Sequence, residues 1–159
     1  LELMEQPIAE WDLDGMAMIR NSTNVLIEAD EGVYNRYDVM RFIKRGAADC
    51  FLIKPAKAGG LYNAKKIVAI AEADGLQCVI GTGWGLGLKV AAKLHLAASS
   101  IVREAAEFSE VFLHGMLLES SYEASFMPPL KDGYLEVPTE PGLGVRLDEK
   151  KITKYLSDI

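Results

Sequence analysis

Three ionisable residues in this chain each close a short apolar run, a placement that can bring catalytic groups together. They are Glu5, Asp30 and Lys54, which lie 25 and 24 residues apart. A fourth apolar run ends 27 residues further on, at Gly81. Such intervals fit one strand and one helix each, and successive parallel strands of a (β/α) barrel present their ends at one mouth. Two carboxylates and an amine at that mouth indicate a divalent cation working with an acid/base.

The segments between these residues predict the elements that must position them. Strands are expected in the apolar runs, and amphipathic helices with cap or turn signals are expected between them. The expected strands are 1–4, 25–29, 50–53 and 77–80, and the expected helices are about 12–20, 34–45, 61–73 and 88–99. Apolar strands that alternate with such helices are typical of a parallel sheet covered by helices.

The rhythm changes after residue 100. We expect a last strand at 111–118, an irregular segment at 120–129, and a tail with turns at Asp132-Gly133 and Pro141-Gly142. A short helix is expected over 149–156. The domain prediction is therefore a partial (β/α) barrel at 1–118 and a C-terminal segment at 119–159, which packs back on the barrel or on a capping domain.

Four or five strands cannot close a barrel, which needs about eight strands and about 250 residues. The chain is then either an open sheet that stands alone or the C-terminal portion of a TIM-like α/β barrel enzyme. We favour the second reading, partly because Leu1 already lies in a strand pattern.

Composition excludes several classes of function. Half of the 159 residues are hydrophobic, which is enough for a real core, and the net charge is −6 without a basic stripe, which argues against nucleic acid. An apolar span of membrane length and a signal peptide are both lacking, so we expect a cytoplasmic protein that does not enter a membrane. Cys50 and Cys78 are expected to be free core thiols rather than a disulfide.

Three motifs in order carry a resemblance to a known family. Residues 3–7 (LMEQP), 29–31 (ADE) and 54–60 (KPAKAGG) resemble the successive strand-end motifs of the enolase superfamily, in its muconate lactonizing enzyme/mandelate racemase branch. Their spacing suits that family, and residues 80–82, 94–98, 132–135 and 141–145 resemble its later segments. The resemblance covers nearly the whole chain and is weakest between residues 103 and 126.

The resemblance implies a site and a reaction. In the family, Mg²⁺ held by strand-end carboxylates binds the carboxylate of a small-molecule substrate, and a base removes the proton alpha to it. Glu5 and Asp30 would be two of the metal ligands and Lys54 the acid/base. Glu31 would hold a cation beside the metal site or be a surface charge. The alternative for each of these residues is a solvated side chain at a strand end.

Two departures from the family pattern matter. Its Lys-x-Lys strand and its first metal-binding Asp, both upstream in the family, have no counterpart here, so the missing N-terminal half or another copy of the chain is an expected partner. The family often carries a Glu in the loop after the fourth strand, whereas this loop carries Trp84. Trp84 would be a substrate-binding wall or cation–π face, or else a packing residue.

The functional prediction is a Mg²⁺-dependent isomerase or lyase of cycloisomerase, racemase or epimerase type. It is expected to act as a homo-oligomer, and residues 1–159 alone are expected to be inactive. The competing hypothesis is a non-catalytic scaffold. The substrate and the choice between cycloisomerase, racemase and dehydratase stay open. His95 and His114 are both expected to be packing residues.

Overall fold

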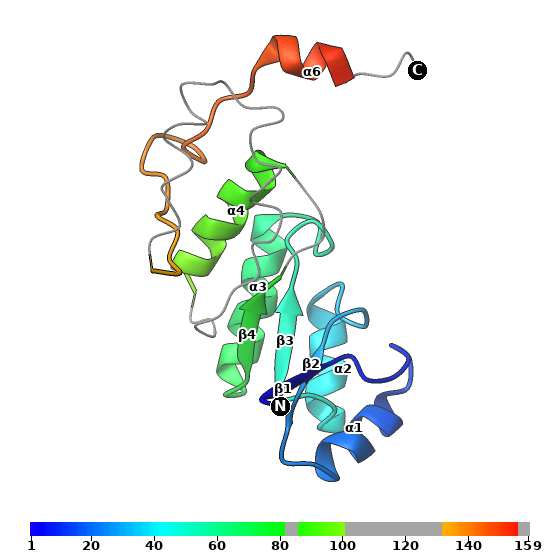
Figure 1. Cartoon of the computed structure of the whole chain (residues 1–159). Helices are drawn as coiled ribbons and strands as arrows, with labels where there is room; N and C mark the ends of the chain where they lie inside the picture. The colour runs from blue at the N-terminus through cyan, green and yellow to red at the C-terminus, as the bar shows by residue number, and fades with distance from the viewer. Residues whose placement is uncertain (82–85, 101–131, 156–159) are drawn as a thin grey trace. The chain divides into compact units, whose positions relative to one another are not determined.

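The computed structural model describes residues 1–81, 86–100 and 132–155 (Figure 1). The chain divides into two compact units. The first contains Leu1–Gly81 and resumes at Ser100, and the second contains the described residues 86–99 and 132–155. Trp84, His114, the strand expected at 111–118 and the domain boundary expected at residue 118 lie outside the described residues, so these remain predictions.

The first unit is built on a four-stranded parallel sheet. Its strands lie side by side in sequence order, which confirms the predicted parallel topology. They are β1 (Leu3–Glu5), β2 (Leu26–Ala29), β3 (Cys50–Ile53) and β4 (Gln77–Ile80). Parallel neighbours require a crossover connection, and a helix supplies each one.

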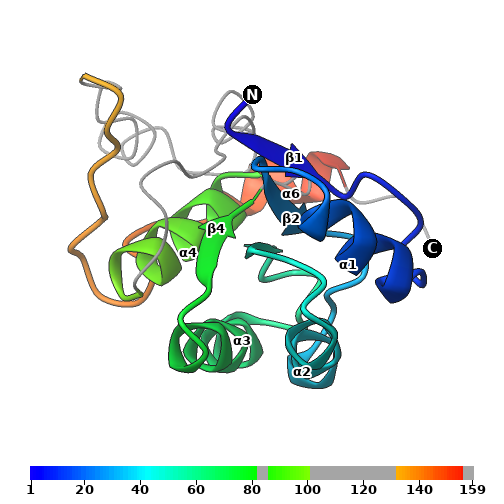
Figure 2. The ribbon, with the colours of Figure 1, turned by 90° about the horizontal axis from the view of Figure 1, so that it is seen from below.

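The three crossover helices cover one face of this sheet (Figure 2). They are α1 (Leu13–Asn21), α2 (Arg36–Arg45) and α3 (Leu61–Ala73), and α2 contacts both of the others. Asp12 caps the start of α1, because its carboxylate accepts a hydrogen bond from the Gly15 N–H at 2.8 Å. The helix-covered face of a curved parallel sheet is the outer face of a (β/α) barrel.

A pair of phenylalanines identifies which strand residues face the helices. Phe42 of α2 meets Phe51 of β3 edge-to-face, with 6.0 Å between ring centroids, and both rings are buried. Because side chains alternate along a strand, Cys50 and Leu52 point to the opposite face. That face also carries Glu28, since the Cys50 thiol donates a hydrogen bond to its carboxylate at 3.3 Å. Cys50 and Cys78 are both buried free thiols, as predicted.

Helix α2 starts two residues later than predicted because its N-terminus is capped by a reciprocal pair of side chains. Asn35 has extended backbone and accepts hydrogen bonds from the N–H groups of Tyr37 and Asp38. The buried Asp38 carboxylate accepts in return from the N–H groups of Asn35 and Tyr34, both at 3.0 Å. Such a capping box fixes both the helix start and the loop that enters it.

The second unit contains α4 (Gly87–Ala98) and α6 (Glu149–Tyr155). Three buried residues of α4 form a small apolar cluster, which side chains of the later segment cover. The cluster is Val90, Ala91 and Leu94, covered by Leu135, Val137, Leu143 and Val145. His95 Nε2 lies 3.3 Å from the Leu143 carbonyl oxygen, which fits the predicted packing role. None of the helices in the described ranges is long and apolar enough to cross a membrane.

Candidate functional site

The four residues singled out from the sequence all lie at the carboxyl ends of adjacent parallel strands. Glu5 is the last residue of β1, while Asp30, Lys54 and Gly81 directly follow β2, β3 and β4. The register holds to the strand ends, since Ile53 pairs with Ile80 and the Gly81 N–H donates to the Ile53 carbonyl at 3.0 Å. The predicted convergence at one edge of the sheet is confirmed for these backbone positions.

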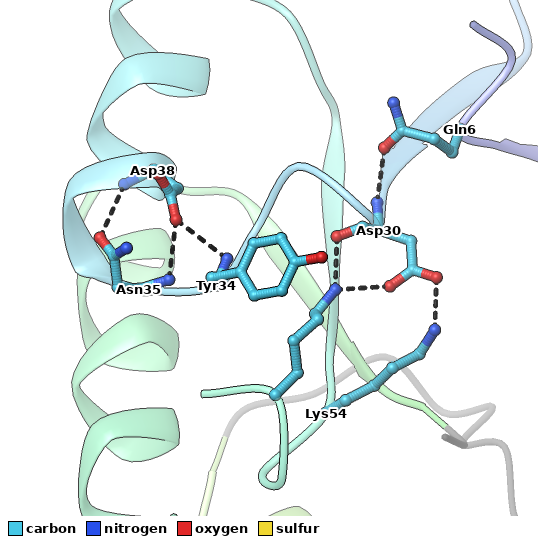
Figure 3. Close-up of polar contacts among 7 residues, drawn as sticks. Gln6, Asp30, Tyr34, Asn35, Asp38 and Lys54 are labelled. Carbon is cyan, nitrogen blue, oxygen red and sulfur yellow. Dashed lines mark hydrogen bonds and ion pairs between the residues drawn. The ribbon is translucent and has the colours of Figure 1, made fainter. Parts of the chain in front are cut away.

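Asp30 is the centre of this edge, and its backbone is fixed on both sides. Its N–H donates to Gln6 Oε1 at 3.0 Å, which ties the end of β2 to the residue after β1 (Figure 3). Its carbonyl oxygen accepts from the Val33 N–H at 2.9 Å and from Lys57 Nζ at 2.5 Å. Only 3% of Asp30 is exposed. These protein contacts therefore take the place of the hydrogen bonds that the residue would otherwise make with water.

The Asp30 carboxylate is shared by two lysine ammonium groups. Lys54 Nζ forms an ion pair with Oδ2 (Figure 3). Lys57 Nζ lies 2.7 Å from Oδ1. Burial by itself would raise the pKa of Asp30. The hydrogen bonds and positive charges of Lys54 and Lys57 outweigh burial and hold its pKa below the ordinary value of 3.8. The carboxylate is therefore ionised at neutral pH.

A tight turn after β3 brings both lysines to the same carboxylate. The Ala58 N–H donates to the Lys54 carbonyl at 3.0 Å, and the Gly60 N–H donates to the Pro55 carbonyl at 2.8 Å. Gly60 has a φ of 109°, a conformation that residues with a Cβ rarely adopt, so glycine is required there. Lys54 and Lys57, three residues apart, consequently reach the carboxylate from the same turn.

Tyr34 covers the second of these lysines. The Lys57 ammonium lies 5.3 Å from the centroid of the Tyr34 ring, in cation–π geometry. The Tyr34 N–H is in turn bound by the Asp38 carboxylate of the α2 capping box. The start of α2 thus positions a ring over the Asp30 site.

The other predicted site residues are placed differently. Glu5 is exposed at the end of β1, and Glu31 is exposed in the turn after Asp30. The structure does not test the metal-binding role of Glu5 or the cation-holding role of Glu31. Trp84, the expected substrate-binding residue, lies outside the described residues.

Three residues at or near the site were not singled out as functional from the sequence. Gln6 and Lys57 both bind Asp30 directly, although Lys57 reads in the sequence as a surface or auxiliary charge. Glu28 is a buried carboxylate on the same sheet face, paired in register with Glu5. The three-residue spacing of Lys54 and Lys57 before Gly59-Gly60 is the signal that could have identified Lys57, because a tight turn brings such residues to one side.

Carboxylate oxygens are the donors that Mg²⁺ prefers, so Glu5 and Asp30 fit this ion in chemical type. They fall short in number, because within residues 1–81, 86–100 and 132–155 no three His, Cys, Asp or Glu side chains gather as a metal site. Both Asp30 oxygens also accept from lysines in this structure. The residues fit part of a magnesium site.

Sequence comparison places the chain among known enzymes. It is 33% identical to a chloromuconate cycloisomerase of Cupriavidus pinatubonensis, an alignment that covers 98% of this chain and 41% of that protein. It is also 33% identical to an L-Ala-D/L-Glu epimerase of Clostridium acetobutylicum, over 91% of this chain and 39% of that protein. The chain therefore spans about two fifths of the length of these relatives.

Solved structures agree with the sequence matches. The fold is similar to that of 2-chloromuconate cycloisomerase from Rhodococcus opacus, with a TM-score of 0.84, 34% identity, and coverage of 98% of this chain and 42% of that one. It is also similar to L-Ala-D/L-Glu epimerase from Bacillus subtilis, with a TM-score of 0.78, 29% identity, and coverage of 91% and 39%. Residues 1–151 match the family described as Enolase C-terminal domain-like. The chain belongs to this family, in the muconate lactonizing enzyme/mandelate racemase branch of the enolase superfamily, and is the C-terminal portion of its α/β barrel.

Proposed function

We propose that the protein carrying this chain is an isomerase that removes the proton alpha to the carboxylate of a small-molecule substrate, with Lys54 as the acid/base. The observation that carries this proposal is the Lys54–Asp30 ion pair at the carboxyl ends of β2 and β3. The amine of Lys54 can transfer a proton, and the neighbouring carboxylate of Asp30 can hold a cation. The relatives named as cycloisomerases and epimerases support an isomerase.

Lys54 has the access that an acid/base needs. Its side chain is 20% exposed while that of Asp30 is 5% exposed, so the lysine is the more accessible partner of the pair. To act as a base, Lys54 must be in its amine form and must leave Asp30. A lysine three residues away remains to neutralise the carboxylate.

Glu5 and Asp30 would hold Mg²⁺ together with a third carboxylate, supplied by an N-terminal half of the protein or by another copy of the chain. When bound, the ion supplies positive charge that stabilises the negative charge developing on the substrate carboxylate. Gln6 and Lys57 would keep Asp30 in place, and Lys54 would move the proton.

The names of the relatives suggest which substrates to test. Muconates, an Ala-Glu dipeptide and N-succinyl amino acids all carry carboxylates, and these compounds appear in the names of similar proteins. Dipeptides, N-acyl amino acids and muconates are therefore the first panel. The rival hypothesis of a non-catalytic scaffold predicts no turnover with any of them.

The test is incorporation of deuterium at the substrate alpha carbon in D₂O, measured by proton NMR with the intact protein and Mg²⁺. Exchange reports proton removal even when the later step fails. Lys54→Met should lower exchange by about 10²- to 10⁴-fold, the usual contribution of a positioned acid/base, while Mg²⁺ binding survives. Lys66→Met is the matched control, because Lys66 also lies over a tyrosine ring, that of Tyr62 at 4.0 Å, but on α3. Undiminished exchange in Lys54→Met would reject Lys54 as the acid/base.

A further inference from the structure

The two lysines at Asp30 hold it in different ways. Among the described residues, Lys54 Nζ makes its polar contact with a single atom, Asp30 Oδ2. Lys57 Nζ binds two oxygens of the same residue, Oδ1 at 2.7 Å and the backbone carbonyl at 2.5 Å, and also faces the Tyr34 ring. Lys54 can therefore leave after breaking one contact, whereas Lys57 is held by three.

The backbone of Tyr34, the residue whose ring lies over Lys57, is held at the start of α2. The Tyr34 N–H is bound by Asp38, whose carboxylate also accepts from the Asn35 N–H and pairs with Arg41 at 2.5 Å. The Asp38 carboxylate is buried, whereas the Arg41 side chain that pairs with it is exposed. Figure 3 shows the Tyr34 ring between this capping box and Asp30. The N-terminus of α2 thereby helps to determine where the Lys57 ammonium can lie.

This difference has an electrostatic consequence for proton transfer. Removing the partner of a buried charge is strongly unfavourable, because the remaining charge loses both its pair and its water. Were Lys54 the single cation at Asp30, its departure toward a substrate would leave such a charge. With Lys57 in place, the carboxylate keeps an ammonium on Oδ1 while Oδ2 becomes available.

We propose that Lys57 is a positioning residue that stays on Asp30 throughout the reaction. Lys54 is then free to move the proton, and Asp30 Oδ2 is free to bind a cation. This inference rests on the proposed function for its catalytic part. Its structural part, a fixed Lys57 beside a releasable Lys54, is independent of any activity.

The structural part is tested by ¹⁵N relaxation of lysine ammonium groups in the intact protein. Lys57 Nζ should be more ordered than Lys54 Nζ and far more ordered than the control Lys66 Nζ. Tyr34→Leu, which removes the ring, should lower the order of Lys57 and leave that of Lys66 unchanged. A Lys57 ammonium as disordered as that of Lys66 overturns the inference.

The catalytic part is tested by steady-state kinetics. Lys57→Met should lower kcat by about 10- to 100-fold, the usual loss when a residue that orients a metal ligand is removed. KM should change little, because Lys57 does not touch the substrate. Lys57→Arg should recover most of kcat, since a guanidinium can donate to both the carbonyl and Oδ1.

Lys66→Met again serves as the control and should keep the wild-type kcat. Circular dichroism at the assay temperature excludes unfolding as the cause of a lower kcat. A Lys57→Met variant with kcat within about twofold of wild type, well below the expected loss, overturns the inference. A wild-type protein without activity on any carboxylate would reject the proposed function instead, and ammonium relaxation would still decide whether Lys57 is fixed.

Discussion

The side chain of Gln6 accepts a hydrogen bond from the backbone N–H of Asp30 at 3.0 Å, and so joins the ends of β1 and β2. Its amide nitrogen donates to the Ile8 carbonyl at 3.0 Å, which fixes the orientation of the side chain. Gln6 also has a φ of 33°, which is uncommon for a residue with a Cβ. An unusual backbone held by two side-chain bonds indicates that the position of Asp30 depends on Gln6.

Replacing Gln6 by leucine should therefore leave the Asp30 N–H without its partner. We expect a loss of about 1–3 kcal/mol in the free energy of unfolding, the usual cost of an unsatisfied buried donor. Urea denaturation measures this loss. Asn63→Leu is the control, because Asn63 makes an exposed side chain-to-backbone bond with the Gly59 carbonyl at 3.3 Å. Equal losses in both variants would contradict the buried role of Gln6.

The lowered pKa of Asp30 predicts how acid affects stability. Because its folded pKa lies below the ordinary value of 3.8, the stabilisation is complete above that value and is lost as pH falls through the folded pKa. Asp30→Asn lacks this titration, so its free energy of unfolding should fall less steeply with acid below about pH 4. Urea titrations between pH 5 and pH 2 measure the slopes, with the exposed Glu2→Gln variant as control. Parallel wild-type and Asp30→Asn curves would contradict the assignment.

Asp30→Asn should also weaken Mg²⁺ binding by the intact protein, since a neutral amide oxygen is a poorer ligand for a hard dication. Calorimetric titration with MgCl₂ measures the affinity, and the Lys54→Met variant should keep the wild-type affinity.

Residues 1–159 alone should show no substrate deuterium exchange. They supply two of the expected carboxylates, and they lack a counterpart of the family's Lys-x-Lys strand. Robust exchange by this segment alone would refute the view that the site needs residues from elsewhere.

Gly81 is the strand-end residue where a side chain cannot be accommodated. A Cβ built there would lie 2.5 Å from Leu52 Cδ1 and 2.6 Å from its Cγ, and Leu52 is fully buried. Gly81→Ala should therefore destabilise the fold by about 1–3 kcal/mol, as overpacking usually does.

A double-mutant cycle with Leu52→Val tests the cause. The smaller side chain should reduce the cost of Gly81→Ala, so the two changes should be less harmful together than their sum. Gly75→Ala is not a suitable control because Gly75 has a φ of 77°. Strictly additive effects would show that contact with Leu52 is not the reason for glycine.

The sequence predicted the sheet well because each strand lies in a short, mainly apolar run with polar residues beside it. The bounds of β3, β4 and α3 agree with the prediction to the residue, and β2 starts one residue late. Helix α2 was predicted to start at Tyr34, two residues before its observed start at Arg36. The capping box sets the observed start, since Asn35 and Asp38 satisfy the free N–H groups only when the helix begins after Asn35.

The site was predicted less completely than the fold. Strand ends mark Glu5, Asp30 and Lys54 because parallel strands deliver their ends to one edge. The side chains that contact Asp30 could not be predicted from strand ends. Gln6 reaches Asp30 across 24 residues of sequence, and Lys57 reaches it only because the glycine-containing turn folds back. Such contacts depend on side-chain direction, which apolar periodicity does not encode.

The buried thiols of the sheet have a practical consequence. Burial, with the nearby carboxylates of Glu72 and Glu28, raises the pKa of Cys78 to about 12. At neutral pH this sulfur is therefore both shielded from reagents and almost never ionised, and only the thiolate attacks an alkylating agent. Cys78 can react only when β4 separates from its surroundings. Its alkylation rate therefore reports how often the sheet opens locally at β4, a few residues before Gly81.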